Sequence, residues 1–276
     1  MLRRLILAIL VAGIPAILLL AFAYAEALRD PVVRRAAIAL PHWPAGAPPV
    51  RAVLISDIHI GPAGMDERRL DRIVTQIAAL KPDIVLIAGD FIFGHEPGTA
   101  ALYGRGLVAP LSRLHPRLGV VAVAGNHDYW TGRAALRAQL AAAHVTMLDN
   151  RAIVRGPLVI GGVSDDYTGH AETGVTEQEM RALPGAPLTL THSPDLAPSV
   201  TGEAPLILAG HTHCGQVVLP FWGPISEVSR FRSRYRCGIV REGRRTVVVT
   251  AGLGTSGGPL RLNAPPDLWV LTLSGR

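Results

Sequence analysis

The sequence predicts an α/β layered fold with mixed sheets, and three observations support this prediction. Short runs rich in valine and isoleucine alternate with helical patterns in the first half of the chain, and similar short runs follow one another in the second half. With 276 residues and a hydrophobic fraction of 49%, the chain can bury a full core. We therefore expect one globular domain, residues 51–276, behind an N-terminal appendage.

The appendage, residues 1–30, contains an apolar run from residue 5 to residue 25 without a charge. This is about the length that crosses a bilayer as a helix. One interpretation is an uncleaved single-pass anchor, and the other is a signal peptide cut after Ala23-Tyr24-Ala25, which fits the small-x-small pattern. Because the run exceeds the usual signal core of about 7–15 residues, we favour the anchor.

The orientation of this segment stays open, because basic residues lie on both of its sides. Arg3 and Arg4 precede it, and Arg29, Arg34 and Arg35 follow it. The start of the chain also has a weak similarity to a twin-arginine export signal, which would place the domain outside the cytoplasm.

A proline-rich linker is predicted at residues 31–50, since four prolines fall within Pro41–Pro49. Such a composition favours a semi-rigid spacer between membrane and domain. No internal repeat or low-complexity tract follows it.

Periodicity and turn residues predict the elements of the domain in order. In the first half, strands are expected at residues 52–55, 84–88 and 120–124, and helices at residues 70–80 and 132–143, the second capped by Thr131. In the second half, strands are expected at residues 152–154, 158–163, 188–191, 206–209, 216–219, 246–250 and 268–273.

Five polar clusters follow such apolar runs. They are Asp57-Ile58-His59, Gly89-Asp90, Gly125-Asn126-His127-Asp128, His192 and Gly210-His211-Thr212-His213. An isolated aspartate after a strand is usually a turn residue, and an isolated histidine is usually a satisfied surface or core group. All five in this order, at the carboxyl ends of strands, indicate instead a two-metal hydrolytic centre with oxygen and imidazole ligands.

The clusters match, in order, the pattern D-x-H, G-D, G-N-H-[DE], a lone histidine and G-H-x-H. Over nearly everything from residue 51 to residue 273 the chain resembles the calcineurin-like metallophosphoesterases. Finer matches point to the membrane-associated bacterial branch with the YkuE and YaeI phosphoesterases. These matches are Ser56 to His59, Thr191-His192-Ser193-Pro194-Asp195, Gly210 to His213 with Gly215-Gln216, and Gly252-Leu253-Gly254-Thr255-Ser256. Cys214 departs from an expected glycine, and Ala264 from a frequent cysteine.

The resemblance implies a sandwich of two mixed β-sheets flanked by helices, at the bacterial inner (cytoplasmic) membrane. It also implies a pair of divalent ions, Mn²⁺, Zn²⁺ or Fe²⁺. Two such ions roughly 3.5–4 Å apart neutralise phosphate oxygens and lower the pKa of a bridging water. A pair of this kind needs a shared carboxylate, and Asp90 is the natural bridge. By resemblance, Asp57, His59 and His213 complete the first site, and Asn126, His192 and His211 complete the second.

His127 is left without a metal in the family pattern, which makes it the general acid or the stabiliser of the leaving oxygen. Its ordinary pKa, about 6.5, suits that role. Asp128 is expected to hold the His127 imidazole in orientation. His95, five residues after Asp90, matches no position of the pattern.

The net charge of +6 comes almost wholly from arginine, since Lys81 is the only lysine, and it favours anionic lipid surfaces or anionic substrates. Arg230, Arg232, Arg234 and Arg236 alternate strictly, and in an extended segment their guanidinium groups would share one face. This arginine quartet is either a charged edge strand or a basic rim that binds anionic headgroups or a nucleotide pyrophosphate. No nucleic-acid recognition module accompanies it, so no nucleic-acid partner is expected.

Cys214 and Cys237 are the two cysteines of the chain, and two free thiols are expected rather than one bridge. Nothing in the sequence indicates the oligomeric state.

These observations favour a membrane-tethered, two-metal phosphoesterase that hydrolyses phosphodiester or pyrophosphate bonds. By resemblance, its substrate is lipid-linked, such as the UDP-2,3-diacylglucosamine of lipid A synthesis. Three alternatives stay open: an exported phosphomonoesterase or phosphodiesterase of the cell envelope, a catalytically silent metal-binding scaffold, and a zinc hydrolase acting on another bond. The scaffold is disfavoured because every ligand position of the pattern is filled.

Overall fold

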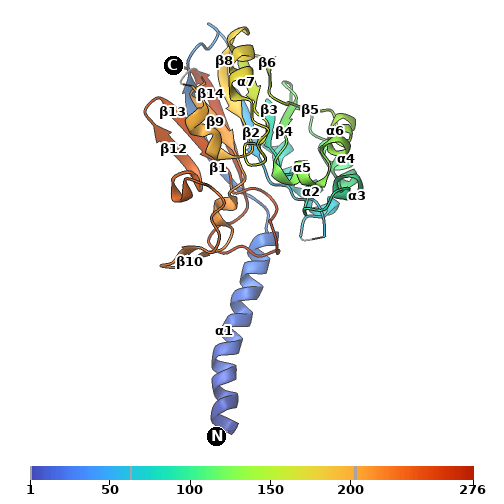
Figure 1. Ribbon diagram of the computed structural model, residues 1–276, viewed down its shortest axis with the longest axis vertical. Helices are drawn as coiled ribbons and strands as arrows, with labels where there is room; N and C mark the ends of the chain where they lie inside the picture. Colours follow the sequence, from blue (N-terminus) through green and yellow to red (C-terminus); the bar gives the residue numbers. More distant parts are fainter. Residues whose placement is uncertain (1, 63, 202–203) are drawn as a thin grey trace.

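Two six-stranded sheets pack face to face, and helices cover their outer faces (Figure 1). This computed structural model describes residues 2–276 except 63 and 202–203, and for residues 2–12 it describes the backbone without the side chains. The prediction of two mixed sheets in a layered α/β fold is confirmed.

The first sheet has the order β1-β14-β2-β3-β4-β5. Its strands are β1 (Val32–Leu40), β14 (Asp267–Gly275), β2 (Val50–Ile55), β3 (Ile84–Ala88), β4 (Val120–Val123) and β5 (Val145–Met147). Strands β2 to β5 run parallel to one another, whereas β14 is antiparallel to β2 and parallel to β1. Every residue of β3 and β4 is buried, as expected for parallel strands covered on both faces.

The second sheet has the order β12-β13-β9-β8-β7-β6. Its strands are β12 (Gly238–Glu242), β13 (Arg245–Val249), β9 (Leu206–Ala209), β8 (Ala186–Leu190), β7 (Leu158–Gly162) and β6 (Arg151–Arg155). The four central strands are parallel, and the two edge strands are antiparallel to them. A separate hairpin pairs β10 (Val218–Leu219) with β11 (Gly223–Pro224).

Helices α2 to α6 lie along the first sheet, and α7 lies against the second. Their bounds are α2 (Glu67–Ala79), α3 (Thr99–Tyr103), α4 (Arg105–Leu111), α5 (Asn126–Thr131), α6 (Arg133–Ala142) and α7 (Thr173–Arg181). Short 3₁₀ turns complete the chain: η1 (Pro194–Ser199), η2 (His213–Gly215) and η3 (Arg232–Tyr235). The predicted cap of α6 is wrong: Gly132 is the N-cap, and the Thr131 hydroxyl donates to the His127 carbonyl at 2.6 Å.

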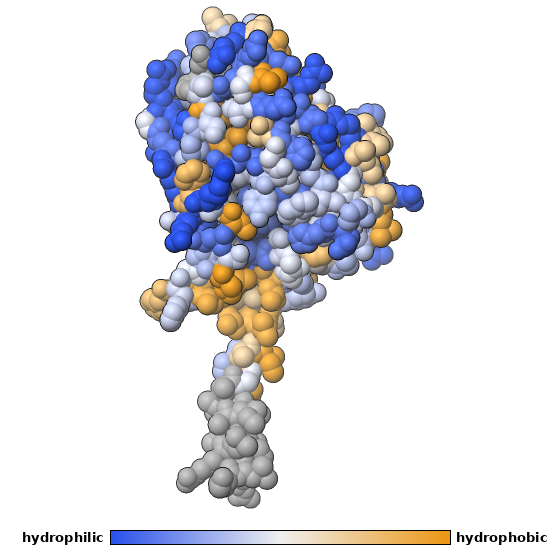
Figure 2. Space-filling view, in the orientation of Figure 1, coloured by the Kyte–Doolittle hydropathy of each residue, from blue (hydrophilic) through white to orange (hydrophobic). Residues whose placement is uncertain are grey.

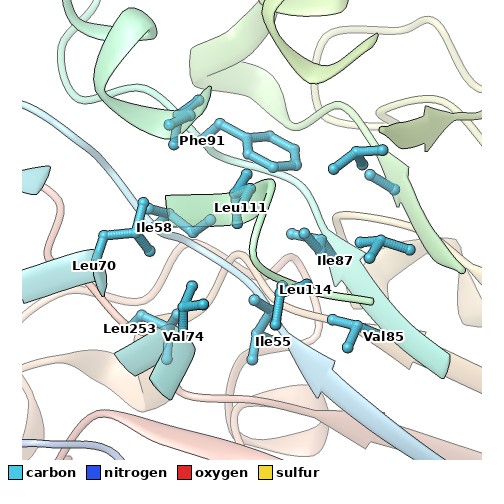
Figure 3. Close-up of a cluster of buried hydrophobic side chains, with 14 of the residues drawn as sticks. Ile55, Ile58, Leu70, Val74, Val85, Ile87, Phe91, Leu111, Leu114 and Leu253 are labelled. Carbon is cyan, nitrogen blue, oxygen red and sulfur yellow. The ribbon is translucent and has the colours of Figure 1, made fainter. Parts of the chain in front are cut away.

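Apolar side chains fill the space on both faces of the first sheet. Ile73 and Ile77 of α2 are fully buried against it, in agreement with the helical spacing in the sequence. Figure 3 shows part of this layer, where Ile55, Val85 and Ile87 of the sheet meet side chains from α2 and α4. Since each such side chain contributes about 1.5–3 kcal/mol when fully buried, the strands that carry the polar clusters have a rigid support.

The predicted boundary between linker and domain is wrong. Residues 32–40, which the sequence assigns to the linker of residues 31–50, form β1 and pair with β14 along their whole length. Ile38 and Leu40 are buried in the core between the sheets, and the Arg34 guanidinium is 2.5 Å from the buried Asp267 carboxylate. The two arginines interrupt the apolar pattern, so the strand was not recognisable from periodicity.

Helix α1 (Leu2–Leu28) leaves the domain at one end and contains Pro15 (Figure 1). Its last turns are attached to the domain, because Ala23 and Ala27 are buried there. Within the described residues, no helix is both long enough and apolar enough to span a bilayer. The predicted anchor covers residues 5–25, and the side chains of its first part, up to residue 12, lie outside the described part of the structure. The anchor therefore stays a prediction.

Candidate metal centre

Five loops meet at one edge of the two sheets, because the strands that deliver them are parallel neighbours. Strands β2, β3 and β4 adjoin in the first sheet, and β8 and β9 adjoin in the second. Main-chain hydrogen bonds link the loops beyond the strands: Asp57 donates to the Gly89 carbonyl and Gly210 donates to the His192 carbonyl, both at 2.9 Å. All seven predicted ligands are buried there: Asp57, His59, Asp90, Asn126, His192, His211 and His213.

The first predicted ligand group is assembled in the structure. His213 Nε2 lies 3.3 Å from Asp57 Oδ1, and His59 Nε2 lies 3.8 Å from the same oxygen and 3.2 Å from His213 Nε2. Asp57 Oδ1 is buried and has no hydrogen-bond partner among the described residues. A buried carboxylate oxygen facing two imidazole nitrogens is what a divalent cation would satisfy, so these residues fit a metal.

The second group lies directly beside the first and shares Asp90 with it. His192 Nε2 is 3.3 Å from Asp90 Oδ2 and 3.1 Å from Asn126 Oδ1, and His211 Nδ1 is 3.1 Å from His192 Nε2. On the other side, His59 Nε2 is 3.6 Å from the same Asp90 oxygen. Asp90 therefore occupies the position expected of a bridging carboxylate.

Burial keeps three imidazoles of this centre neutral, those of His59, His211 and His213. It lowers the pKa of His59 to about 3, and burial together with the adjacent His192 lowers the pKa of His211 to about 3. Burial and His59 also lower the pKa of His213 well below its usual value. For the fourth, His192, burial opposes the charge, but Asp90 raises its pKa well above the usual value. For Asp90, burial opposes ionisation, but His192 lowers its pKa well below the ordinary value. Neutral imidazoles beside ionised carboxylates are the protonation states that coordinate a metal.

Most of the proposed ligands have a backbone conformation that is rare for residues with a side chain. Positive φ angles occur at Asp57 (50°), His59 (49°), Asp90 (57°), His211 (71°) and His213 (48°). Such outliers concentrate at functional sites, where the surrounding structure holds them. The loops also approach closely at Gly125, where a Cβ atom would lie 2.3 Å from Asp90 Oδ1.

His127 lies beside the two ligand groups. Its Nδ1 is 2.7 Å from the Gly94 carbonyl, and its main-chain N–H donates to Asp90 Oδ1 at 2.9 Å. Its Nε2 faces the centre at 4.0 Å from Asp90 Oδ2, and its ring meets that of His59 edge-on at 4.7 Å. Donor atoms of His59, Asp90 and His127 lie close enough to share an ion, so its role as a non-ligand stays a prediction.

The predicted orienting role of Asp128 stays a prediction, and the described contact of the His127 Nδ1 atom is with the carbonyl of Gly94. The Asp128 carboxylate accepts four main-chain N–H bonds: from Asp90 and Gly125 at Oδ2, and from Phe91 and Ile92 at Oδ1. Burial, with Asp90 adding to it, raises the pKa of Asp128 to about 8, and the N–H donors oppose this rise. Asp128 therefore fixes the loop that carries Asp90.

The arginine quartet does not form the extended row that the sequence predicts. Residues 232–235 form the 3₁₀ turn η3, since Tyr235 is fully buried in the core behind the second sheet. Three members contact carboxylates: Arg230 pairs with Asp166 and Asp195, Arg234 with Glu242, and Arg236 with Glu227. Within the described part of the chain, Arg232 makes no ion pair. A substrate role for the quartet stays a prediction.

Cys214 and Cys237 form a disulfide, which corrects the prediction of two free thiols. Their Cα atoms lie 4.8 Å apart, and the Thr212 hydroxyl donates to the Arg236 carbonyl at 2.7 Å in the same place. The bridge joins the loop of His211 and His213 to the quartet segment. Since the two cysteines lie far apart in sequence, only the fold could reveal that they meet.

Arg261 is a further residue of the centre, and no pattern in the sequence predicts its role there. Its side chain is fully buried, and Nη2 lies 3.3 Å from His213 Nδ1. The guanidinium also donates to the main-chain carbonyls of His213, Ala251, Gly252, Gly254 and Ala264. Burial lowers its pKa to about 10. Arg261 therefore ties the first ligand group to the glycine-rich loop before β14. The only signal in the sequence was its nearness to Ala264, a position where the branch often has cysteine.

Aromatic rings border the centre on its outer side. The His95 and Trp130 rings lie 4.6 and 5.0 Å from the His127 ring, and the half-exposed Tyr167 ring lies 5.0 Å from that of His211. This aromatic rim of His95, Trp130 and Tyr167 spans both ligand groups. His95 thus lies beside His127, although it matches no position of the sequence pattern.

Two adjoining sets of buried oxygen and imidazole donors around one shared carboxylate define the class of two-metal hydrolases. The family model described as calcineurin-like phosphoesterase matches residues 50–215, and the chain belongs to that family. The resemblance read from the five clusters is therefore confirmed.

Relatives of known sequence include proteins of bacteria and animals. A metallophosphoesterase of Aquifex aeolicus is 30% identical over 82% of this chain and 86% of its own length. The YkuE metallophosphoesterase of Bacillus subtilis is 29% identical over 83% and 81%. A zebrafish protein named for a transmembrane segment and a metallophosphoesterase domain is 28% identical over 98% of this chain, which spans 63% of that relative.

Proposed function

We propose that the protein is a two-metal-dependent hydrolase of phosphodiester or pyrophosphate bonds. The observation that carries this proposal is the position of Asp90, whose Oδ2 lies 3.3 Å from a nitrogen of one ligand group and 3.6 Å from a nitrogen of the other. Divalent ions held by these groups would neutralise the phosphate oxygens and activate water for attack on phosphorus.

In this reaction the residues of the chain would position the phosphate and supply a proton to the leaving oxygen. Attack by water breaks the bond from phosphorus to the leaving oxygen, which then needs a proton. His127 Nε2 faces the centre, while Nδ1 is held by the Gly94 carbonyl at 2.7 Å. In its imidazolium form His127 would donate the Nε2 proton to the leaving oxygen, a step that typically contributes about 10²–10⁴-fold.

The proposed substrate carries its phosphate at a membrane. Support comes from the apolar N-terminal segment and from the zebrafish and cattle relatives, whose names include a transmembrane segment. We retain the single-pass anchor at the bacterial inner membrane as part of this proposal. Arg232, with no ion pair among the described residues, is the member of the quartet best placed to meet an anionic headgroup.

Two substrate settings follow from the two orientations of the anchor. A cytoplasmic domain would meet a nucleotide-linked lipid such as UDP-2,3-diacylglucosamine, and an exported domain would meet phosphodiesters of the envelope. The disulfide between Cys214 and Cys237 favours export, because disulfides persist in oxidising compartments.

The test is an assay of the full-length protein in detergent, stripped of metal and titrated with Mn²⁺. UDP-2,3-diacylglucosamine, a lipid phosphodiester and a phosphomonoester serve as substrates, and Asp90→Asn is the control for the centre. Metal-dependent turnover of one of the first two, lost in the control, is expected. Stoichiometric metal binding without turnover of any substrate would identify a scaffold, and turnover of an amide or lactone instead would identify another class of hydrolase.

A further inference from the structure

We infer that the β10–β11 hairpin, residues 217–228, is a lipid-contacting surface that rests in the interface of a bilayer. Phe221 is fully exposed, Trp222 is 88% exposed and Ile225 is 68% exposed. These side chains add nothing to the core of the domain. The inference goes beyond the proposed function, because it concerns where the protein touches its surroundings rather than which bond it cleaves.

We call residues 217–228 the apolar hairpin. Its turn is unusual in both residue type and conformation. Residues between paired strands are normally glycine, asparagine, aspartate or other small polar types. Here Pro220, Phe221 and Trp222 connect Leu219 to Gly223, and Phe221 has a φ of 67°, which is rare for a bulky residue. The side chains of Phe221 and Trp222 add no buried surface to the fold. We therefore infer that they contact something other than this chain.

The base of the apolar hairpin and the last turns of α1 are attached to the same short segment, residues 261–263. Val218 donates its N–H to the Leu262 carbonyl at 2.9 Å, and the Asn263 amide donates to the Val218 carbonyl at 2.8 Å. The Arg261 N–H donates to the Ala23 carbonyl of α1 at 2.9 Å. The apolar hairpin and helix α1 therefore hold a fixed position relative to each other.

Both projections lie at one end of the molecule and both are apolar there. Figure 1 shows β10 at the end from which α1 leaves, and Figure 2 shows apolar surface on the helix and on the adjoining part of the domain. The described part of α1 exposes Ile17, Leu18, Leu20 and Phe22. Exposed apolar patches of this kind mark contact sites. A helix and a separate loop tip at the same end fit the flat surface of a bilayer.

The residue types of the apolar hairpin favour the interfacial region of the bilayer over its hydrocarbon centre. Tryptophan is enriched at the boundary between headgroups and acyl chains, and interfacial segments also bury phenylalanine there. Arginine nearby favours anionic headgroups. Arg232, exposed and without an ion pair among the described residues, lies in the connection between β11 and β12, where it lines a small pocket with Ser226 and Val228 of the apolar hairpin. The partner is therefore a bilayer that contains anionic lipid.

The apolar hairpin begins immediately after the metal-binding loop, since η2 ends at Gly215 and Gln216 bonds to the Ser256 carbonyl at 2.9 Å. A bilayer in contact with Trp222 would therefore lie close to the loop of His211 and His213. This consequence for lipid-borne substrates rests on the proposed function, whereas the contact itself does not.

The test uses full-length protein reconstituted into vesicles of phosphatidylethanolamine and phosphatidylglycerol. The acyl chains carry bromine either near the headgroup or near the bilayer centre, and bromine quenches tryptophan emission on contact. Subtracting the spectrum of Trp222→Phe isolates Trp222 from Trp43, Trp130 and Trp269. We expect a blue-shifted Trp222 emission that loses most of its intensity with the shallow bromine and less with the deep one. Unquenched, unshifted Trp222 emission in both vesicles would overturn the inference.

A pair of double variants supplies the matched control. Phe221→Ser with Trp222→Ser changes the apolar hairpin, while Val154→Ser with Val175→Ser changes exposed residues of β6 and α7 at the far end of the domain (Figure 1). Because α1 could keep either variant on the vesicles, the readout is trypsin cleavage after Arg230 and Arg232, which only the first variant should speed. If both behave as wild type, the apolar hairpin does not contact the membrane. If the first instead turns a dimer in detergent into a monomer, the surface contacts a second copy and the bilayer assignment is wrong. Neither outcome bears on turnover of a soluble substrate.

Discussion

Replacing Asp128 by asparagine should destabilise the protein by leaving two buried N–H groups without an acceptor. Each carboxylate oxygen of Asp128 accepts from two main-chain N–H groups at 2.9–3.3 Å. An asparagine keeps one acceptor oxygen and turns an NH₂ group toward the other pair. At about 1–3 kcal/mol for each unpaired buried donor, the loss is roughly 2–6 kcal/mol. In a domain of this size, that lowers Tm by roughly 5–20 °C.

Thermal unfolding followed by circular dichroism, with metal content measured on the same samples, tests this magnitude. The control is Asp149→Asn, the same substitution at a partly exposed carboxylate that pairs with Arg133 and Arg137. Its effect should stay near 1 kcal/mol or below, since exposed pairs contribute about that much. A variant of Asp128 with unchanged Tm and full metal, but reduced turnover, would refute the reasoning and support the role of orienting His127.

Three further predictions concern the centre and its surroundings. Asp90→Asn should lower metal occupancy at both ligand groups and turnover by orders of magnitude, measured by elemental analysis and kinetics; full activity with one ion per chain would contradict the shared position of Asp90. His127→Ala should lower turnover by about 10²–10⁴-fold at near-normal metal content; a parallel loss of metal would make His127 a ligand. Reducing the Cys214–Cys237 bridge, with a separation of 23 residues, should lower unfolding stability in urea by about 3 kcal/mol; equal midpoints with and without reductant would show that the bridge adds no stability.

The placement of the ligands could be predicted from the sequence because it depends on strand ends. Asp57, Asp90 and Asn126 each follow an apolar run that forms a buried parallel strand, and such strands end at one edge of a sheet. That the loops of the second sheet, with His192 and His211, come to the same edge followed from the family resemblance. Periodicity contains no information about how two sheets are stacked.

The missed features depend on contacts between distant segments. Asp128 acts on the main chain of residues 90–92, which no side-chain pattern encodes. Arg261 is fully buried, although arginine is almost never so unless its charge is paired. Its residue type therefore predicts an exposed side chain. The sequence does not predict strand β1, because Arg34 and Arg35 hide its alternation and the partner of Arg34, Asp267, is 233 residues away.

The positive φ angles of the proposed ligands affect which substitutions this chain tolerates in evolution. A residue with a side chain in that region costs of order 1–3 kcal/mol, so five such ligands together approach the whole stability of an ordinary domain, about 5–15 kcal/mol. Glycine at any of these positions would relieve the backbone and abolish a ligand at the same time. A chain released from selection for metal binding should therefore lose these side chains early, because their loss favours folding. Asp57, His59 and Asp90 are thus side chains that this backbone would fold more easily without.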